Sequence, residues 1–445
     1  MRYKAIASAL LLCSIHASAQ DSTVVAGPWT LRQCIDYALE HNISIKQSSI
    51  NVRQKEIALN TAEARRLPGI SASGTQNFSF GRGLTADNTY SNTNTTSTSF
   101  SLGGDIPIFH GFDINNGIKL SKLDLQAATT DLQKAKDDIK VAVAQAYTQV
   151  LYSREILSVA SNQVRIDSLQ HERLKLMYKT GKASTSDVAA QAASLAQSKL
   201  SETQALGNER IALLDLSQLL ELASPEGFDI CTPPEELLGL RLLLKPEDIY
   251  AEAVEERPAI ISEQLRLDYA NVDIARAKGG LLPSLSLSGG IGTNFYTANG
   301  TQSASFGEQL KNNFSQYIGL SLNIPIFARF STRNSIRSAQ LAYDNQKLQL
   351  ENTKKSLYKE IQQAYYNAVT SQSRYTSSEQ AAISAEQSFN LIRERYENGK
   401  ANITEYNEAK NRYLEAASNF LQARYECLFQ TKLLDFYRIG DIDLQ

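Results

Sequence analysis

The stretch Ile106-Pro107-Ile108-Phe109 decides the fold, because the same four residues return as Ile324-Pro325-Ile326-Phe327. The offset is 218 (324 − 106), and Tyr178-Lys179-Thr180-Gly181-Lys182-Ala183 matches Tyr396-Glu397-Asn398-Gly399-Lys400-Ala401 at the same offset. This period is far too long for a solenoid repeat, so each copy is a complete structural half. The sequence therefore predicts a tandem duplication.

The N-terminus has the features of a secretory signal. Arg2 and Lys4 precede an apolar stretch from Ala5 to Ile15, and the small residues 17–19 follow. This order is typical of a cleavable signal peptide, so we expect residues 1–19 to be removed. After them no apolar run reaches about 18 residues, which predicts no membrane-spanning helix. A place in a membrane would then require strands.

Composition excludes several classes of function. The formal net charge of −2 excludes a basic surface for nucleic acid. Cys34, Cys231 and Cys427 are odd in number and lack metal-like spacing, so neither a disulfide framework nor a zinc site is implied. The sequence has no nucleophile elbow, phosphate-binding loop or histidine-rich metal spacing. We therefore expect neither enzymatic activity nor a cofactor.

Each half begins with a predicted helix that a proline ends. Residues 31–66 carry apolar side chains at helical spacing, and residues 246–281 are their counterpart. Leu67-Pro68 follows the first helix and Leu282-Pro283 the second, at an offset of 215 (282 − 67). Proline ends a helix because it has no backbone N–H to donate.

Strands are predicted next, at residues 70–80 and 98–109 and again at residues 285–296 and 314–327. The last one alternates aliphatic residues with Gly, Ser, Asn and Pro. A period of two, with one apolar face and one small or polar face, fits a strand between lipid and a wet lumen. The polar tract from Thr85 to Thr96 is predicted to be a loop between strands.

Two very long helices are predicted after the strands, over residues 113–178 and 331–396. An uninterrupted helix of this length would span on the order of 100 Å. Apolar and small residues recur along both at alternating spacings of four and three, which is typical of a coiled-coil seam. In the first helix they are Ile139, Val143, Ala146, Val150, Ser153, Leu157, Ala160 and Val164.

Each long helix is predicted to turn back at a glycine. Gly181 and Gly399 suit the left-handed residue that ends a helix. Return helices are expected over residues 186–222 and 404–437, capped by Ser184 or Thr185 and by Asn402 or Thr404. Residues 20–222 thus form the first half, residues 223–245 a linker and residues 246–445 the second half.

Four strands per chain predict an oligomer. Four antiparallel strands cannot close a barrel, and open strand edges are not tolerated in hydrocarbon. Two chains would supply eight strands and three chains would supply twelve. The helices would then line up below the strands as one continuous tube.

These features resemble the TolC-like outer membrane efflux proteins. The similarity lies in the opening Trp29-Thr30-Leu31, the Leu-Pro before the first strand of each half, the Pro-Ile-Phe after the second, and the Tyr-x-x-Gly-Lys-Ala turns. Each motif is weak alone, but their order and duplication make the set specific. The resemblance covers essentially the whole mature chain.

The resemblance implies the architecture, the partners and the function. It implies an α+β membrane protein, a homotrimer with a twelve-stranded β-barrel in the outer membrane of a Gram-negative bacterium and a long α-helical coiled-coil tunnel in the periplasm. It further implies docking on a periplasmic adaptor (membrane fusion) protein coupled to an inner-membrane RND or ABC pump. Small molecules or secreted polypeptides would pass through it, in tripartite efflux or type I secretion.

The resemblance also implies where functional residues lie. Glu405 and Glu408 match two carboxylates that ring the periplasmic entrance in this family. Three copies would bring six carboxylates to a narrow aperture, which favours cations. The alternative is that acids in the first turn of a helix simply complement the helix dipole.

Further family positions concern closure of the entrance and contact with the adaptor. Asp187 and Tyr396 match residues that hold the entrance shut, but Ala401 replaces the family's basic residue, so Lys400 or another arrangement would have to act. The turns at Gly181-Lys182 and Gly399-Lys400 match adaptor-contact regions. A plain turn would need the same glycines.

The rival hypothesis is a structural or adhesive protein, with the coiled coils as a stalk and the strands as a cap. Heat-dependent mobility on a denaturing gel together with ion conductance separates the two hypotheses, because only a closed barrel shows both.

Overall fold

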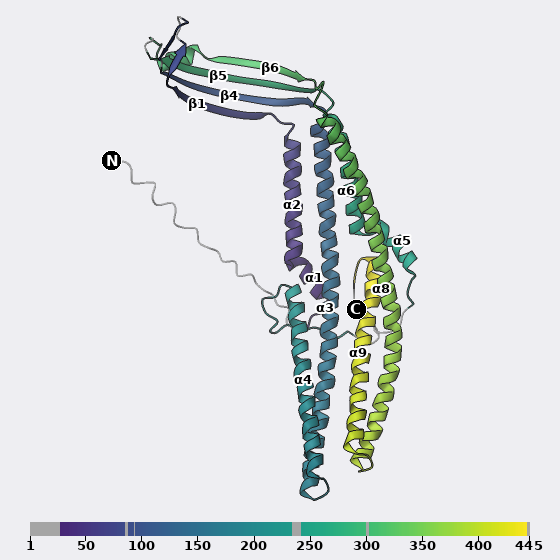
Figure 1. Ribbon diagram of the computed structural model, residues 1–445. Helices are drawn as coiled ribbons and strands as arrows, with labels where there is room; N and C mark the ends of the chain where they lie inside the picture. Colours follow the sequence, from purple (N-terminus) through teal and green to yellow (C-terminus); the bar gives the residue numbers. More distant parts are fainter. Residues whose placement is uncertain (1–26, 85–87, 93, 234–241, 300–301, 443–445) are drawn as a thin grey trace, which may run out of the picture.

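The molecule is elongated, with a β-sheet at one end and two helical hairpins at the other (Figure 1). The computed structural model describes residues 27–84, 88–92, 94–233, 242–299 and 302–442. The expected signal peptide, residues 1–19, lies outside the described residues, as do residues 234–241 of the expected linker. No described helix has an apolar stretch long enough to cross a membrane.

Each helix that leads to the sheet is broken into two, where the sequence predicted one. The first half has α1 (Leu31–His41) and α2 (Ile43–Ala64). Asn42 interrupts them with an extended ψ of 131°, and its side chain accepts a hydrogen bond from the backbone N–H of Ser44.

The second half has α5 (Pro246–Glu256) and α6 (Pro258–Gly279) in the corresponding place. The break falls at Arg257, because the ring of Pro258 disfavours helical backbone in the preceding residue. The single helices expected over residues 31–66 and 246–281 are therefore wrong at these two points.

The main sheet contains two strands from each half. They are β1 (Gly69–Ser79), β4 (Thr95–His110), β5 (Ser284–Ala298) and β6 (Ser315–Asn323). Their order is β1-β4-β5-β6, and every neighbouring pair is antiparallel. The two halves therefore join through β4 and β5, while β1 and β6 form the edges.

The ends of the strands differ from the sequence prediction. Residues 324–327 were expected to complete the last strand, but β6 ends at Asn323. Pro325 cannot donate a ladder hydrogen bond, which favours this earlier end. Its counterpart Pro107 stays within β4, where the register shifts between Pro107 and Phe109.

Two small elements at the far end of the sheet were not expected. The predicted loop between Thr85 and Thr96 includes part of a short hairpin, β2 (Arg82–Leu84) with β3 (Tyr90–Asn92), while residues 85–87 and 93 lie outside the described residues. A seven-residue helix, α7 (Phe306–Asn312), precedes β6 and is capped by Ser305.

Below the sheet each half forms a helical hairpin. The long arms are α3 (Asp113–Lys179) and α8 (Ser331–Glu397), of 67 residues each, and the return arms are α4 (Thr185–Leu219) and α9 (Ile403–Ile439). A straight helix of that length spans about 100 Å. The predicted seam is buried in its central part, which in α8 comprises Leu357, Ile361, Ala364, Ala368 and Ser371.

Two glycines bring the halves into contact at the foot of the sheet. Gly111 has a φ of 56°, and a Cβ atom there would lie 2.3 Å from the carbonyl oxygen of Gly279. A Cβ atom on Gly279 would in turn lie 2.2 Å from the carbonyl oxygen of Gly111. No side chain fits at either position without moving the backbone, so the end of α6 packs directly on the start of α3.

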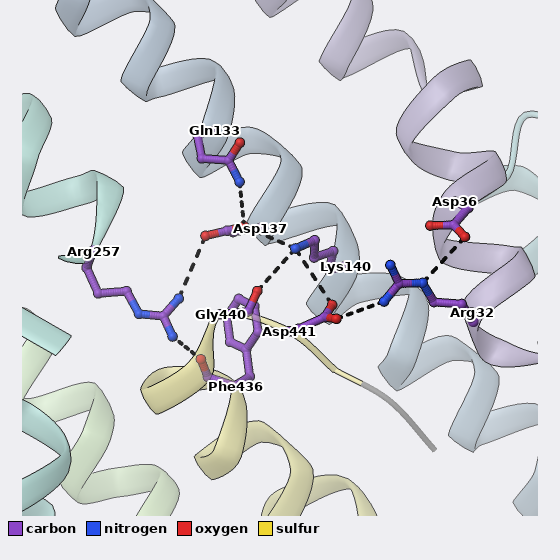
Figure 2. Close-up of polar contacts among 9 residues, drawn as sticks. All are labelled: Arg32, Asp36, Gln133, Asp137, Lys140, Arg257, Phe436, Gly440 and Asp441. Carbon is purple, nitrogen blue, oxygen red and sulfur yellow. Dashed lines mark hydrogen bonds and ion pairs between the residues drawn. The ribbon is translucent and has the colours of Figure 1, made fainter. Parts of the chain in front are cut away.

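A polar cluster fastens the chain's C-terminal segment at mid-height (Figure 2). The buried Arg257 guanidinium donates to the carbonyl oxygens of Phe436 and Tyr437 and lies 3.7 Å from the Asp137 carboxylate. Lys140 Nζ donates to the carbonyl oxygen of Gly440 at 3.1 Å. Cations at a helix C-terminus satisfy carbonyls that have no helical partner, so α9 is held by residues from both halves.

Candidate functional site

The tips of the two hairpins hold most of the residues that the sequence singled out. Both turns close in the same way. Lys182 N–H donates to Met177 O at 2.8 Å, and Lys400 N–H donates to Arg395 O at 2.7 Å. Gly181 and Gly399 have φ values of 74° and 68°, where a glycine avoids the strain of a side chain.

The first acidic residue after each turn caps its own helix. Asp187 N–H donates to Ser184 Oγ at 3.1 Å, and Ser184 N–H donates to Asp187 Oδ2 at 3.0 Å. Glu405 N–H donates to Asn402 Oδ1 at 2.8 Å, and Asn402 Nδ2 donates to Glu405 Oε1 at 2.9 Å. These are reciprocal caps, so Asp187 and Glu405 each have a local structural role.

Asp187 and Tyr396 lie at the tips of different hairpins and interact through charge. Hydrogen bonds from the Ser184 hydroxyl and backbone N–H lower the pKa of Asp187. Burial raises the pKa of Tyr396, and the Asp187 carboxylate raises it further. The described residues show no hydrogen bond between the two side chains. Instead, the Tyr396 ring stacks on Tyr406, with centroids 4.9 Å apart.

Lys400, the third expected closing residue, is exposed. The direct link between the hairpins at this level uses Glu397 instead. Gln170 Nε2 donates to Glu397 Oε1 at 2.9 Å, and Arg173 Nη2 donates to the carbonyl oxygen of Glu397 at 2.6 Å. Sequence reasoning did not identify these three residues.

A buried ion pair lies further from the tips and was also missed. Asp167 on α3 is fully buried, and Lys410 on α9 keeps only 6 % of its side chain exposed. Lys410 Nζ donates to Asp167 Oδ2 at 3.1 Å and to Ser194 Oγ at 2.6 Å. The carboxylate also accepts hydrogen bonds from Gln163 and Ser198. Both charges are therefore satisfied within the protein.

A signal for this pair exists in the sequence. The seam of α3 runs through Ala160 and Val164, and its next position is Asp167. A carboxylate at a position that should be apolar implies a buried partner, because an unpaired charge is costly there. The sequence alone does not identify Lys410 as that partner, since it lies 243 residues further on.

Glu408 differs from the other acids at the tips. It is exposed on the second turn of α9, three residues after Glu405. The first hairpin has Ala190 at the corresponding position, so this acid belongs to the second hairpin alone. Within the described residues, no cluster of His, Cys, Asp and Glu could hold a metal ion. Glu405 and Glu408 thus place two exposed carboxylates at the tip of the second hairpin.

The outer membrane efflux protein family matches the chain twice, over residues 34–221 and 249–434. Among relatives, the outer membrane protein TolC of Escherichia coli (strain K12) is 26% identical over 367 residues, which cover 78% of this chain and 71% of that protein. The outer membrane protein OprJ of Pseudomonas aeruginosa is 24% identical, covering 85% and 78%.

Solved structures share the fold. The outer membrane protein VceC of Vibrio cholerae aligns with a TM-score of 0.74 at 18% identity, covering 92% of this chain and 95% of that one. The outer-membrane channel OprN gives a TM-score of 0.75 at 19% identity, covering 93% and 91%. Two family matches, one in each half, account for the duplication, and the chain belongs to the outer membrane efflux protein family.

Proposed function

We propose that three copies of this chain form one continuous duct. Each copy would supply four strands to a twelve-stranded barrel, and the helical hairpins would form the tunnel below it. The sheet order supports this assembly, because β1 and β6 are the edge strands of the described sheet and each has one side without a partner strand. In hydrocarbon such edges must be paired, and pairing β6 of one copy with β1 of the next would achieve it.

As a member of this family, the chain is an outer-membrane channel for export, in tripartite efflux or type I secretion. For its partners we propose a periplasmic adaptor protein and an inner-membrane RND or ABC pump. The adaptor would contact the hairpin tips at Gly181-Lys182 and Gly399-Lys400. The exposed basic side chains beside both turns support this choice.

At the tips we propose an entrance lined by Glu405 and Glu408. Because Glu405 caps α9 through Asn402, its carboxylate is held at the start of the helix, while Glu408 is exposed one turn further on. The entrance would be closed by contacts between hairpins. The effect of the Asp187 charge on Tyr396 and the hydrogen bonds of Glu397 with Gln170 and Arg173 support a closing network, with Lys400 at its rim.

The observation that carries the proposal is that one duplicated chain has both a sheet with an apolar and a polar face and two long helical hairpins. Purified protein in planar bilayers should show discrete conductance steps, and its mobility on a denaturing gel should change on heating. A protein that shows neither would be a stalk with a soluble cap rather than a duct.

The entrance is tested separately. Glu405→Gln with Glu408→Gln should lower selectivity for K⁺ over Cl⁻ and weaken block by polyvalent cations added on the helical side. Glutamine can still cap a helix at this position, so the tip should keep its shape. Glu415→Gln, further along α9, is the matched control. Unchanged selectivity in the double variant would remove both residues from the entrance.

A further inference from the structure

The main sheet carries a single carboxylate, Asp105 on β4. None of the other residues of β1, β4, β5 and β6 is Asp, Glu, Lys or Arg, and their one histidine is His110, the last residue of β4. A lone charge on strands that are otherwise rich in Gly, Ser and Thr has no obvious use in folding.

The register places Asp105 on the polar face of the sheet. Across the four strands it aligns with Gly69, Ser288 and Gly319. Residues directly opposite each other on antiparallel strands share a face. The next row, Ile106 with Leu287 and Leu320, therefore lies on the opposite, apolar face. In a membrane barrel the apolar face meets lipid and the polar face lines the lumen.

Nothing among the described residues neutralises this carboxylate. Asp105 is exposed, and it forms no ion pair or side-chain hydrogen bond with any residue that the structure describes. Its Oδ1 atom lies 3.7 Å from the position that a Cβ atom on Gly69 would take. Small neighbours thus leave the charge open on the lumenal side.

An aromatic ring lies on the same face of the sheet, one row away from Asp105. The Tyr317 ring covers Gly290, and its hydroxyl oxygen lies 3.8 Å from the position of a Cβ atom on Gly103, two residues before Asp105. Tyr317 is 61% exposed, so one face of the ring is open. A carboxylate and an open ring face at neighbouring levels of one lumen offer the chemistry that recognises organic ammonium ions.

We infer that Asp105 forms a cation-selective ring inside the β-barrel, far from the acidic entrance, and that Tyr317 makes this level of the lumen favour organic cations. The inference rests on the proposed trimer, which brings three copies of each residue to one lumen.

The expected size of the effect on ion selectivity follows from the geometry of the barrel. Twelve strands about 4.8 Å apart and tilted by about 40° give a barrel radius of about 12 Å. Each carboxylate then lies about 8 Å from the axis, which is about one Debye length at physiological salt. Three screened charges at that distance give a potential of about one kT at the axis, so the ratio of cations to anions rises roughly sevenfold.

The test is the zero-current potential of single channels in planar bilayers under a KCl gradient. In the background Glu405→Gln/Glu408→Gln, the remaining cation selectivity should fall several-fold with Asp105→Asn and turn towards anions with Asp105→Lys. Ser99→Asn, on the same face, is the control and should change nothing. An unchanged potential in Asp105→Asn would overturn the inference while the channel itself stands. Wild-type protein without conductance would overturn the proposed duct, and this ring with it.

The role of Tyr317 in favouring organic cations is tested by a separate measurement. The permeability of tetraethylammonium relative to K⁺ should fall with Tyr317→Leu and be retained with Tyr317→Phe, which keeps the ring. Equal ratios in wild type and Tyr317→Leu would remove Tyr317 from the selectivity of the lumen.

Discussion

The long helices α3 and α8 are copies of one ancestral element, yet only α3 serves as the spine of the molecule. Both contain 67 residues, but α3 packs on α1, α2, α4, α6 and α9, while α8 packs on α5, α6 and α9. Figure 1 shows α3 between its return arm α4 and the second hairpin, and running up to the sheet.

The difference lies in four aspartates. On α3, Asp113, Asp131, Asp137 and Asp167 pair in turn with Arg276, Arg266, Arg257 and Lys410 of the second half. At the offset of 218 the matching residues of α8 are Ser331, Gln349, Lys355 and Ala385. In these four ion pairs between the halves, the acids thus lie on one copy and the bases on the other. The pairs of Arg32 and Lys140 with Asp441 run the other way.

The largest effect is expected where the pair is most buried. Lys410→Ala leaves the Asp167 carboxylate buried without a cation, so the free energy of unfolding should fall by about 3–5 kcal/mol. Chemical unfolding of the detergent-solubilised protein, followed by circular dichroism, measures this change. The double variant Asp167→Ala/Lys410→Ala should recover much of the loss, because it removes both charges. Strictly additive losses would show that the pair is not coupled.

The cluster at mid-height should rank second. Arg257→Ala removes a guanidinium that serves two carbonyl oxygens and the Asp137 carboxylate, and should lower the free energy of unfolding by about 2–3 kcal/mol. Arg374→Ala is the matched control, because its pair with Glu426 is largely exposed and should be worth less than about 1 kcal/mol. Equal losses in the two variants would contradict the role given to burial.

Removing the helix caps allows a direct comparison of the two tips. Ser184→Ala and Asn402→Ala each remove a reciprocal cap and should each cost about 1 kcal/mol. Proteolysis of the tips in the folded protein measures local opening at each turn. Similar rates in both variants are expected if the tips are equivalent in their local structure. Much faster proteolysis in one variant than in the other would show that the two tips are not equivalent in their local structure.

The pH dependence at the foot of the sheet should be the smallest effect. Burial acts to raise the pKa of Asp113, but the hydrogen bond and charge of Arg276, with the charge of Arg65, lower it overall. A lowered pKa means that the carboxylate stabilises the fold above its ordinary pKa, near 4, and that this stability is lost as the pH falls further. The difference between wild type and Asp113→Asn in thermal midpoint should therefore shrink below about pH 4. In the second half, Ser331→Ala should show no such trend.

The sequence could predict the helices and strands better than it could predict the candidate site. Period-two alternation in residues 318–322 and the glycines of the two turns act through local backbone geometry, so the strands and hairpins could be predicted. The breaks at Asn42 and Arg257 fall inside helical patterns and depend on a single cap or a single following proline, which periodicity does not register.

The candidate site was harder to predict. Asp187 and Glu405 stand out because a turn precedes them, but their hydrogen bonds to Ser184 and Asn402 give them a cap role as well. The link from Glu397 to Gln170 spans 227 residues of sequence and is set by how the hairpins pack. No pattern within one half contains that information.

The unpaired edges of β1 and β6 have a consequence for inheritance. In the proposed trimer, each copy completes the strand pairing of its neighbour, so one copy with a damaged β6 leaves a gap in a ring whose other members are intact. Cells that make normal and damaged chains in equal amounts would build intact rings from only about one in eight random triplets. A lesion in this edge strand should therefore act as a dominant trait, whereas a lesion that merely unfolds the chain should be recessive.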